Sequence, residues 1–159
     1  QIVLVGSKRI GKSILSQIPT SKVLVIEFDP DVIKILKEEK YDYLFGDATD
    51  PDIYEHINFK KLKLFISSSP SFAVNRALLE YLKKIKGRGV KFKIIVRARD
   101  DFEARQLYKK GADYVLLPHL TSGYYLGKAL ARNENLQFLH NLRTRDIALM
   151  KQTEEFVER

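Results

Sequence analysis

The 159-residue sequence contains no cysteine and only three histidines. Without cysteine, a disulfide, a thiolate zinc site and a cysteine nucleophile are all excluded. His56, His119 and His140 do not have a metal-binding spacing, so we predict no metal site. No apolar run reaches the roughly 18 residues that a membrane-spanning helix needs. A chain of this length is close to the usual size of one domain and is long enough for one substantial core.

The net charge of +8 leaves three interpretations open. Basic proteins attract nucleic acid, anionic lipid or anionic ligands. The lysines are scattered along the sequence in short sets such as Lys60, Lys61, Lys63 and Lys83, Lys84, Lys86. Because no basic stripe is interleaved with aromatic residues, we expect no nucleic-acid partner. The pattern favours a solvated surface of mixed charge, and proximity to an anionic membrane face is the remaining interpretation.

Short β-branched segments alternate with helix-length amphipathic segments. The predicted strands are Ile2–Val5, Val23–Phe28, Tyr43–Phe45, Leu62–Ile66, Phe92–Val96 and Tyr114–Leu117. Apolar runs of this kind are typical of strands that are buried on both faces. Predicted helices lie between them at Pro30–Glu39, Ser71–Lys86 and Asp100–Lys110. We therefore predict an α/β fold with a doubly wound, six-stranded parallel sheet and right-handed crossovers.

The pattern changes after the last predicted strand. Pro118–Arg132 predicts a helix, although two glycines weaken it. After a break, the remaining residues predict a mostly helical arm with spaced apolar positions. We therefore predict one domain at residues 1–132 and a C-terminal helical arm at residues 133–159. The arm either carries contacts with a dimer partner or packs back on its own domain.

The first predicted strand leads into a glycine loop, Gly6–Ser13, which fits two phosphate-binding patterns. It satisfies the P-loop pattern GxxxxGK[ST] at every position, but it has only two of the three glycines of the dinucleotide pattern GxGxxG. Both patterns aim backbone N–H groups at a phosphate. Glu27 ends the second strand at the place where a Rossmann domain has its ribose-binding acid, and Asp29 follows it. This context favours a Rossmann-like nucleotide site over a P-loop.

Lys8 occupies the place of the missing middle glycine. That glycine normally lets the backbone approach a pyrophosphate, so Lys8 argues for a mononucleotide or for a dinucleotide in a shifted pose. Lys8 and Arg9 also offer positive charge to phosphates. The alternative is that both side chains point to solvent.

Further motifs, taken in their order along the chain, resemble those of one family. They are GDATD at Gly46–Asp50, ISSSP at Ile66–Pro70 with Asn75 behind it, VRAR at Val96–Arg99 and GADYV at Gly111–Val115. Together with the glycine loop and the second-strand acids, they resemble RCK domains, also called KTN or TrkA-N domains. The ISSSP and GADYVLLPH segments are most similar to the Kef-like cation:proton antiporter branch.

The resemblance implies an adenine-nucleotide site, for NAD(H), AMP, ADP or ATP, at the carboxyl ends of the strands. Its implied residues are Gly6, Ser7, Lys8, Arg9, Ile10 and Gly11 around the phosphates, Glu27 and Asp29 at the ribose, Asp47, Ala48 and Thr49 beside the adenine, and Ser67, Ser68 and Arg97 along the crevice. The residues after the third, fourth and fifth strands also have structural alternatives. Asp47 would cap the helix after Asp50-Pro51, and Thr49 would be an N-cap or turn residue. Arg97 would form a structural ion pair, and the two serines would satisfy backbone groups.

The resemblance further implies a non-catalytic sensor, which regulates a potassium channel or a cation:proton antiporter in the same or another chain. Such a domain works at the cytoplasmic face of the cell membrane, as a homodimer or higher homo-oligomer. Two enzyme classes are the alternatives. A small NAD-dependent oxidoreductase needs a Tyr-x-x-x-Lys pair, whose spacing only Tyr124 and Lys128 match here. A P-loop nucleotide hydrolase would use Lys12.

Overall fold

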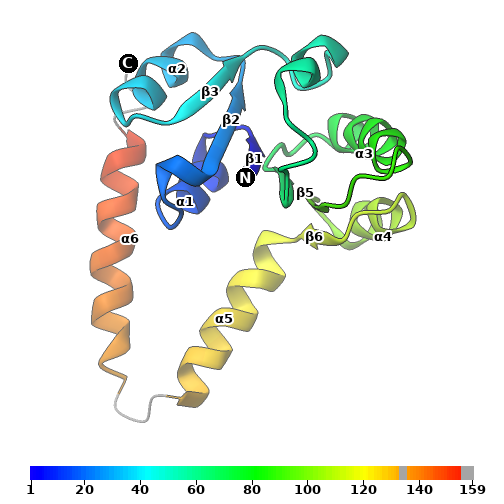
Figure 1. Ribbon diagram of the computed structural model, residues 1–159. Coiled ribbons are helices and arrows are strands. Elements are labelled where there is room, and N and C mark those ends of the chain that lie inside the picture. The colour runs from blue at the N-terminus through cyan, green and yellow to red at the C-terminus, as the bar shows by residue number, and fades with distance from the viewer. Residues whose placement is uncertain (133–135, 155–159) are drawn as a thin grey trace. The chain divides into compact units, whose positions relative to one another are not determined.

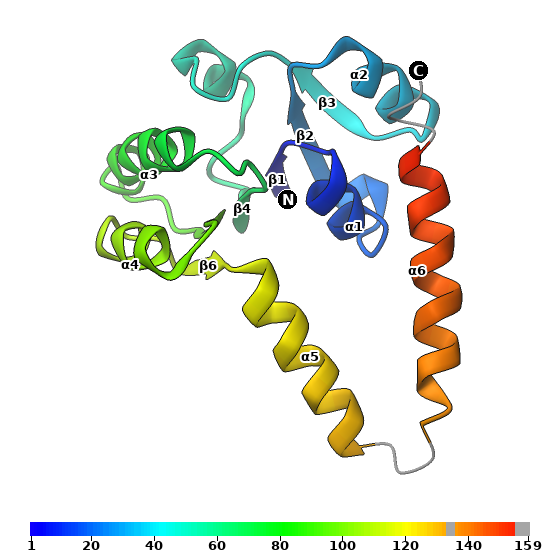
Figure 2. The same cartoon turned by 180° about the vertical axis from the view of Figure 1, so that it is seen from behind.

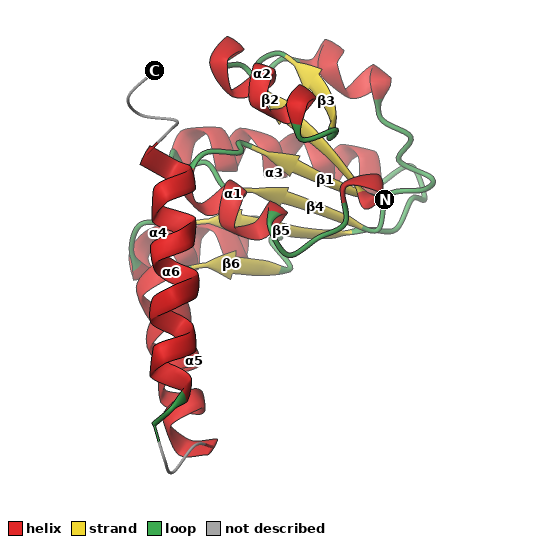
Figure 3. Ribbon diagram, turned by 90° about the vertical axis from the view of Figure 1, so that its left-hand side faces the viewer, coloured by secondary structure: helices red, strands yellow, loops and turns green. Residues whose placement is uncertain are grey.

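Six parallel strands form the centre of the first structural unit, Gln1–Leu116, of the computed structural model, which describes residues 1–132 and 136–154. The strands are β1 (Ile2–Val5), β2 (Val23–Glu27), β3 (Asp42–Phe45), β4 (Leu64–Ser67), β5 (Lys93–Arg97) and β6 (Tyr114–Leu116). Their order in the sheet is β3-β2-β1-β4-β5-β6, and Figure 3 shows them running in one direction. The predicted six-stranded parallel sheet is confirmed, with strand ends that differ from the prediction by one or two residues.

Helices cover both faces of this sheet, as Figures 1 and 2 show. They are α1 (Arg9–Leu15), α2 (Pro30–Glu38), α3 (Phe72–Lys86) and α4 (Asp101–Lys109), together with the 3₁₀ helices η1 (Thr20–Lys22) and η2 (Pro51–His56). Helices α1 and α2 lie on one face, and α3 and α4 lie on the other, as right-handed crossovers in opposite directions require. The first turns of α2, α3 and α4 are capped by the side chains of Asp29, Ser71 and Asp100.

The core lies between the central strands and these helices. Val3, Val25 and Phe65 in the strands and Leu82 in α3 have no exposed surface. The strands β1 and β2 are buried along nearly their whole length, which explains why their sequences are apolar without alternation. Burial of these side chains is the main favourable term in folding the unit.

The order in which strands are added to the sheet changes side at β1. From β1 the chain moves outward to β2 and β3, and then it crosses to β4 on the other side of β1 and continues to β6. At such a switch point the loops after β1 and β4 leave toward opposite faces, and open α/β sheets bind ligands in the crevice that this leaves outside the carboxyl ends of the strands. This edge of the sheet is where the predicted site residues lie.

The second structural unit, Leu117–Arg159, contains α5 (Pro118–Arg132) and α6 (Phe138–Glu154). Our predicted boundary after Arg132 lies at the end of α5, whereas the two structural units meet between Leu116 and Leu117, before α5. The predicted break at residues 133–135 and the end of the predicted arm, residues 155–159, lie outside the described residues. Among the helices in residues 1–132 and 136–154, none is both long and apolar enough to cross a membrane.

Candidate functional site

The glycine loop after β1 is a tight turn that depends on both of its glycines. Gly6 has a φ of 78°, a left-handed conformation that favours glycine, and its N–H donates to the Ile26 carbonyl of β2 at 3.0 Å. A Cβ atom on Gly6 would lie 2.9 Å from Ser68 Oγ. A Cβ atom on Gly11 would overlap the carbonyl oxygen of Gly6. The first turn of α1 therefore packs directly on the backbone at the end of β1.

Ser7 and Glu27 join the glycine loop to the end of β2. Glu27 Oε2 accepts hydrogen bonds from the Ser7 N–H at 2.9 Å and from Ser7 Oγ at 3.1 Å. The other oxygen, Oε1, accepts from the N–H groups of Phe28 at 3.0 Å and Asp29 at 3.2 Å. Glu27 is only 3% exposed and Ser7 only 2%. The predicted ribose acceptor therefore has four donors from its own chain, and it holds the loop in place.

Asp29 is the more accessible acid at the end of β2. Its Oδ1 caps α2 by accepting from the Asp31 N–H at 3.0 Å, and its Oδ2 lies 2.7 Å from Lys8 Nζ. The hydrogen bond from Lys8 lowers the pKa of Asp29, and the same bond raises the pKa of Lys8. The Lys8 side chain thus does not simply point to solvent, because it spans the gap between the glycine loop and the start of α2.

The segment after β3 carries the predicted adenine-side residues. The Gly46 N–H donates to the Glu27 carbonyl at 3.0 Å, which places this segment beside the end of β2. Asp47 Oδ1 accepts from the N–H of Thr49 at 2.7 Å and from its hydroxyl at 2.8 Å. The alternative that Asp47 caps the next helix is wrong, because Asp50 caps η2 by accepting from the Asp52 N–H.

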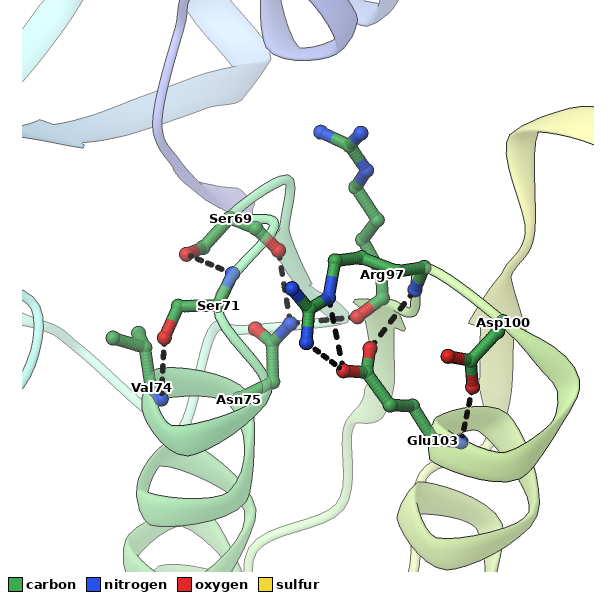
Figure 4. Close-up of polar contacts among 8 residues, drawn as sticks. Ser69, Ser71, Val74, Asn75, Arg97, Asp100 and Glu103 are labelled. Atoms are coloured by element: carbon green, nitrogen blue, oxygen red, sulfur yellow. Dashed lines mark hydrogen bonds and ion pairs between the residues drawn. The ribbon is translucent and has the colours of Figure 1, made fainter.

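The ends of β4 and β5 contribute polar groups that lack partners within the described residues. Ser68 Oγ donates to the Gly6 carbonyl at 2.9 Å, whereas the buried Ser67 Oγ has no partner. The Arg97 guanidinium makes one long contact, from Nη1 to the Ser68 carbonyl at 3.5 Å, and its buried Nε is unpaired. Figure 4 shows the Arg97 side chain pointing away from Glu103, which is instead bound by Arg99. The alternative of a structural ion pair for Arg97 is therefore wrong.

Asn75 is a residue of this region that we did not predict as part of the site. Its side chain is fully buried, and its Nδ2 donates to the carbonyls of Ser69 at 2.9 Å and Arg97 at 2.7 Å (Figure 4). Asn75 thereby holds the loop after β4 against the end of β5. It also fixes the position of the Arg97 backbone, from which the Arg97 side chain extends. The only signal in the sequence was its position behind the ISSSP motif, which did not specify a role.

The P-loop interpretation does not fit this geometry. A P-loop places its lysine at the start of the helix, beside the phosphates. Here α1 begins at Arg9, and Lys12 lies in the next turn, with its Nζ 3.6 Å from Glu39 Oε1 behind the end of α2. Its side chain is only 14% exposed. Lys12 therefore links α1 to the C-terminal end of α2 through this ion pair.

The structure brings most of the predicted site residues to one edge of the sheet. Direct contacts join Gly6 to Ser68 and Ser7 to Glu27, and an ion pair joins Lys8 to Asp29. Three others stay near the first turn of α1, where Arg9 is exposed, Ile10 half-buried and Gly11 buried. Ala48 is buried and faces a small cavity of about 30 Å³ beside Tyr54 and α3, while Asp47 and Thr49 are exposed.

Tyr54 lies beneath this adenine-side segment and was not predicted. Its hydroxyl donates to the Ala48 carbonyl, and its ring stacks on Tyr81 of α3 with 4.5 Å between the centroids. Burial raises the pKa of Tyr54. The hydrogen bond from Tyr54 therefore holds the Ala48 backbone, and with it the loop that carries the predicted adenine-side residues.

Known proteins are similar to this chain in sequence and in fold. Residues 2–118 match the family model for the TrkA-N domain. Potassium channel protein 1 and probable potassium channel protein 2 of Methanocaldococcus jannaschii are each 28% identical, over 145 and 144 residues. The matches cover 88% and 86% of this chain but only 42% and 40% of those proteins, so the chain spans about two fifths of their length.

Solved structures with low sequence identity confirm the Rossmann-like fold. The TrkA-N domain of the Escherichia coli inner membrane protein ybaL has a TM-score of 0.71 at 20% identity, covering 82% of this chain and 96% of that one. The Shewanella denitrificans Kef CTD in AMP-bound form has a TM-score of 0.63 at 20% identity, covering 99% and 96%. The GsuK channel bound to NAD has a TM-score of 0.62 at 18% identity, covering 74% and 21%. Since the family model covers most of the chain, the predicted resemblance is confirmed: the chain belongs to the TrkA-N domain family.

Proposed function

We propose that this chain is a nucleotide-binding regulatory domain of a potassium channel or a cation:proton antiporter. Its family membership supports this role, as do its relatives among archaeal potassium channel proteins. Two similar structures are named for nucleotide complexes, the Kef CTD with AMP and the GsuK channel with NAD. We extend an adenine-nucleotide ligand from those proteins to this chain, and the antiporter branch stays a prediction from the sequence motifs.

The observation that carries the proposal is the buried, unpaired Nε of Arg97 at the end of β5, next to the unpaired Ser67 hydroxyl at the end of β4. Among the described residues, the rest of this guanidinium has one long contact, to the Ser68 carbonyl. Buried polar groups are normally hydrogen-bonded, because an unmade bond leaves their desolvation uncompensated. A guanidinium suits phosphate, with which it forms charge-assisted bonds. A phosphate in the crevice would supply the missing partner.

The acids at the end of β2 divide their work in this proposal. Glu27 is buried and holds Ser7, so it acts as a positioning residue for the glycine loop. Asp29 is the acid that meets the ribose hydroxyls, since its side chain is 25% exposed. Lys8 leaves Asp29 for the ligand phosphate, because a phosphate offers it a comparable charge-assisted bond. The exchange frees Asp29 at the moment when the ribose needs an acceptor.

The domain regulates without catalysis in this proposal. A ligand shifts a conformational equilibrium only if it binds the two states with different affinity. The two states here are arrangements of a homodimer or higher homo-oligomer at the cytoplasmic face of the membrane, coupled to the channel or antiporter. An oxidoreductase is less well supported, because Tyr124 and Lys128 lie in α5, after the last strand of the sheet.

The direct test is calorimetric titration of the chain with AMP, ADP, ATP, NAD and NADH. We expect at least one of them to bind, and Asp29→Asn to weaken AMP binding about tenfold, the effect of one lost hydrogen bond to a charged group. The same substitution is expected not to weaken the binding of 2′,3′-dideoxy-AMP, because that ligand lacks the hydroxyls and because the loss of the Asp29 charge releases Lys8 for its phosphate. Asp31→Asn is the matched control, since Asp31 is also an exposed acid at the start of α2. If none of the five nucleotides binds, the proposal is wrong.

A further inference from the structure

Basic residues that are far apart in the sequence gather at the amino edge of the sheet, opposite to the crevice. They precede β4, end α3 and form the loop before β5. We call them the basic edge: Lys60, Lys61, Lys63, Lys83, Lys84, Arg88 and Lys91. These lysines are scattered along the sequence, and the parallel pairing of β4 with β5 is what brings them together.

Backbone and ring contacts join the two segments that carry the basic edge. The Lys93 N–H, at the start of β5, donates to the Lys63 carbonyl at 2.9 Å. The ring of Phe59 lies 5.7 Å from the ring of Phe92, centroid to centroid, and Lys86 Nζ lies 5.6 Å from the Phe92 centroid. The segment before β4, the end of α3 and the start of β5 therefore share one surface.

The positive charge of this surface is not neutralised. All seven residues are exposed, and within the described residues none of them forms an ion pair. Asp113, directly before β6, already binds Lys86 at 3.2 Å and Lys93 at 2.7 Å. Glu80 of α3 is paired with Lys110 at 2.7 Å. Glu80 also interacts electrostatically with Lys84, and the basic edge otherwise keeps its charge available to a partner.

Helix stability accounts for only part of this arrangement. Cations at the end of a helix are favoured by its dipole, which explains Lys83 and Lys84. It does not explain Lys60, Lys61 and Lys91, which lie in the segments that connect helices and strands. The acidic helix caps lie at the other edge of the sheet, beside the crevice.

We propose that the basic edge docks on an anionic phospholipid surface. Clusters of four to eight lysines or arginines are typical of segments that bind anionic lipid headgroups. Six of the seven residues are lysine, whereas arginine is favoured for nucleic-acid recognition. No exposed aromatic side chain for base stacking lies in these segments, since Phe59 is half-buried and Phe92 buried. The choice of lipid rests in part on the proposed function, which brings the chain to a membrane.

The test is co-sedimentation of the chain with vesicles of phosphatidylcholine alone or mixed with phosphatidylglycerol. We expect binding only to the mixed vesicles and its loss at high salt, which screens surface charge. The triple variant Lys61→Glu, Lys84→Glu, Lys91→Glu is expected to bind at least about a hundredfold more weakly. The matched control Lys37→Glu, Arg105→Glu, Lys128→Glu changes the net charge equally, at exposed positions outside the basic edge, and is expected to retain most of the binding.

Other outcomes would overturn the proposal. Equal losses in both triple variants would mean that net charge alone attracts the chain. No binding to the mixed vesicles, or tighter binding to a double-stranded oligonucleotide at the same salt concentration, would exclude lipid as the partner. Nucleotide titration of the basic-edge variant separates this proposal from the proposed function, because the crevice lies at the other edge and its ligand affinity should not change.

Discussion

The Lys8 ammonium lies 2.7 Å from the Asp29 carboxylate, so the position that usually holds a glycine in a dinucleotide loop is tied to the cap of α2. Asp29 uses one oxygen for the Asp31 N–H and the other for Lys8. A ligand that reaches the end of β2 must therefore compete with a side chain of the protein. The affinity of the site depends on how strongly Lys8 and Asp29 hold each other.

Lys8→Met should raise the pKa of Asp29 toward the ordinary value of about 3.9, because it removes the hydrogen bond that lowers this pKa. The loss of unfolding free energy should stay below about 1 kcal/mol, since Lys8 is largely exposed. Carbon-detected NMR titration of the Asp29 carboxyl measures the shift. Lys34→Met, which removes the neighbouring pair with Asp31, should leave the pKa of Asp29 in place. An unchanged Asp29 pKa in the Lys8 variant would show that the pair does not persist in solution.

Gly11→Ala should destabilise the chain by several kcal/mol. The new methyl group would overlap the Gly6 carbonyl and push the first turn of α1 away from the end of β1. Urea unfolding measures the effect. Gly123→Ala is the control, since that glycine lies in α5 with open space around it. It should stabilise α5 by about 0.5–1 kcal/mol through helix propensity. Equal effects of the two substitutions would contradict the close packing of α1 on β1.

Asn75→Ala should lower the unfolding free energy by about 2–4 kcal/mol, because it leaves two buried carbonyls, those of Ser69 and Arg97, without their donor. It should also weaken nucleotide binding, since the end of β5 would no longer be fixed. Ser71→Ala, which removes the cap of α3, should cost about 1 kcal/mol and leave binding unchanged. Thermal unfolding and calorimetry on both variants provide the comparison, and a smaller loss for Asn75→Ala than for Ser71→Ala would refute this role.

Asp113→Asn should destabilise the chain at neutral pH but not in acid. Burial alone would raise the pKa of Asp113, but the bonds from Lys93, the Ile94 N–H and Lys86 outweigh it and lower the pKa. The folded pKa thus lies below the unfolded value, so the stabilisation is present above about pH 4 and is lost as the pH falls through the folded pKa. Unfolding free energies of the two proteins, measured from pH 7 down to pH 3, should converge. A constant difference across this range would contradict the lowered pKa.

Much of the fold could be predicted from the sequence because its signals are local. The apolar runs of β1 and β2 predict strands buried on both faces, and Gly6 and Gly11 predict a tight turn into a helix. Glu27 is the last residue of β2 and Asp29 lies two residues beyond it, so their place beside the glycine loop follows from parallel pairing. These relationships need only the strand order, which the alternation of elements already indicates.

The rest depends on side-chain directions and partners that spacing does not specify. The glycine loop satisfies the P-loop pattern, but only the packing of α1 against α2 shows that Lys12 faces Glu39. Likewise, Glu27 was predicted to face a ribose, whereas its hydrogen bonds to Ser7 become visible only with the loop in place. Each outcome is decided by contacts between elements that are distant in the sequence.

The Ser7–Glu27 contact has a mechanical consequence. Glu27 binds Ser7 with one oxygen and the first two N–H groups after β2 with the other, and the second of these belongs to the residue that caps α2. A displacement of the glycine loop would therefore act on the first turn of α2 through two carboxylates, that of Glu27 and that of Asp29. We therefore expect the glycine loop and the start of α2 to move together, because both are bonded to the end of β2.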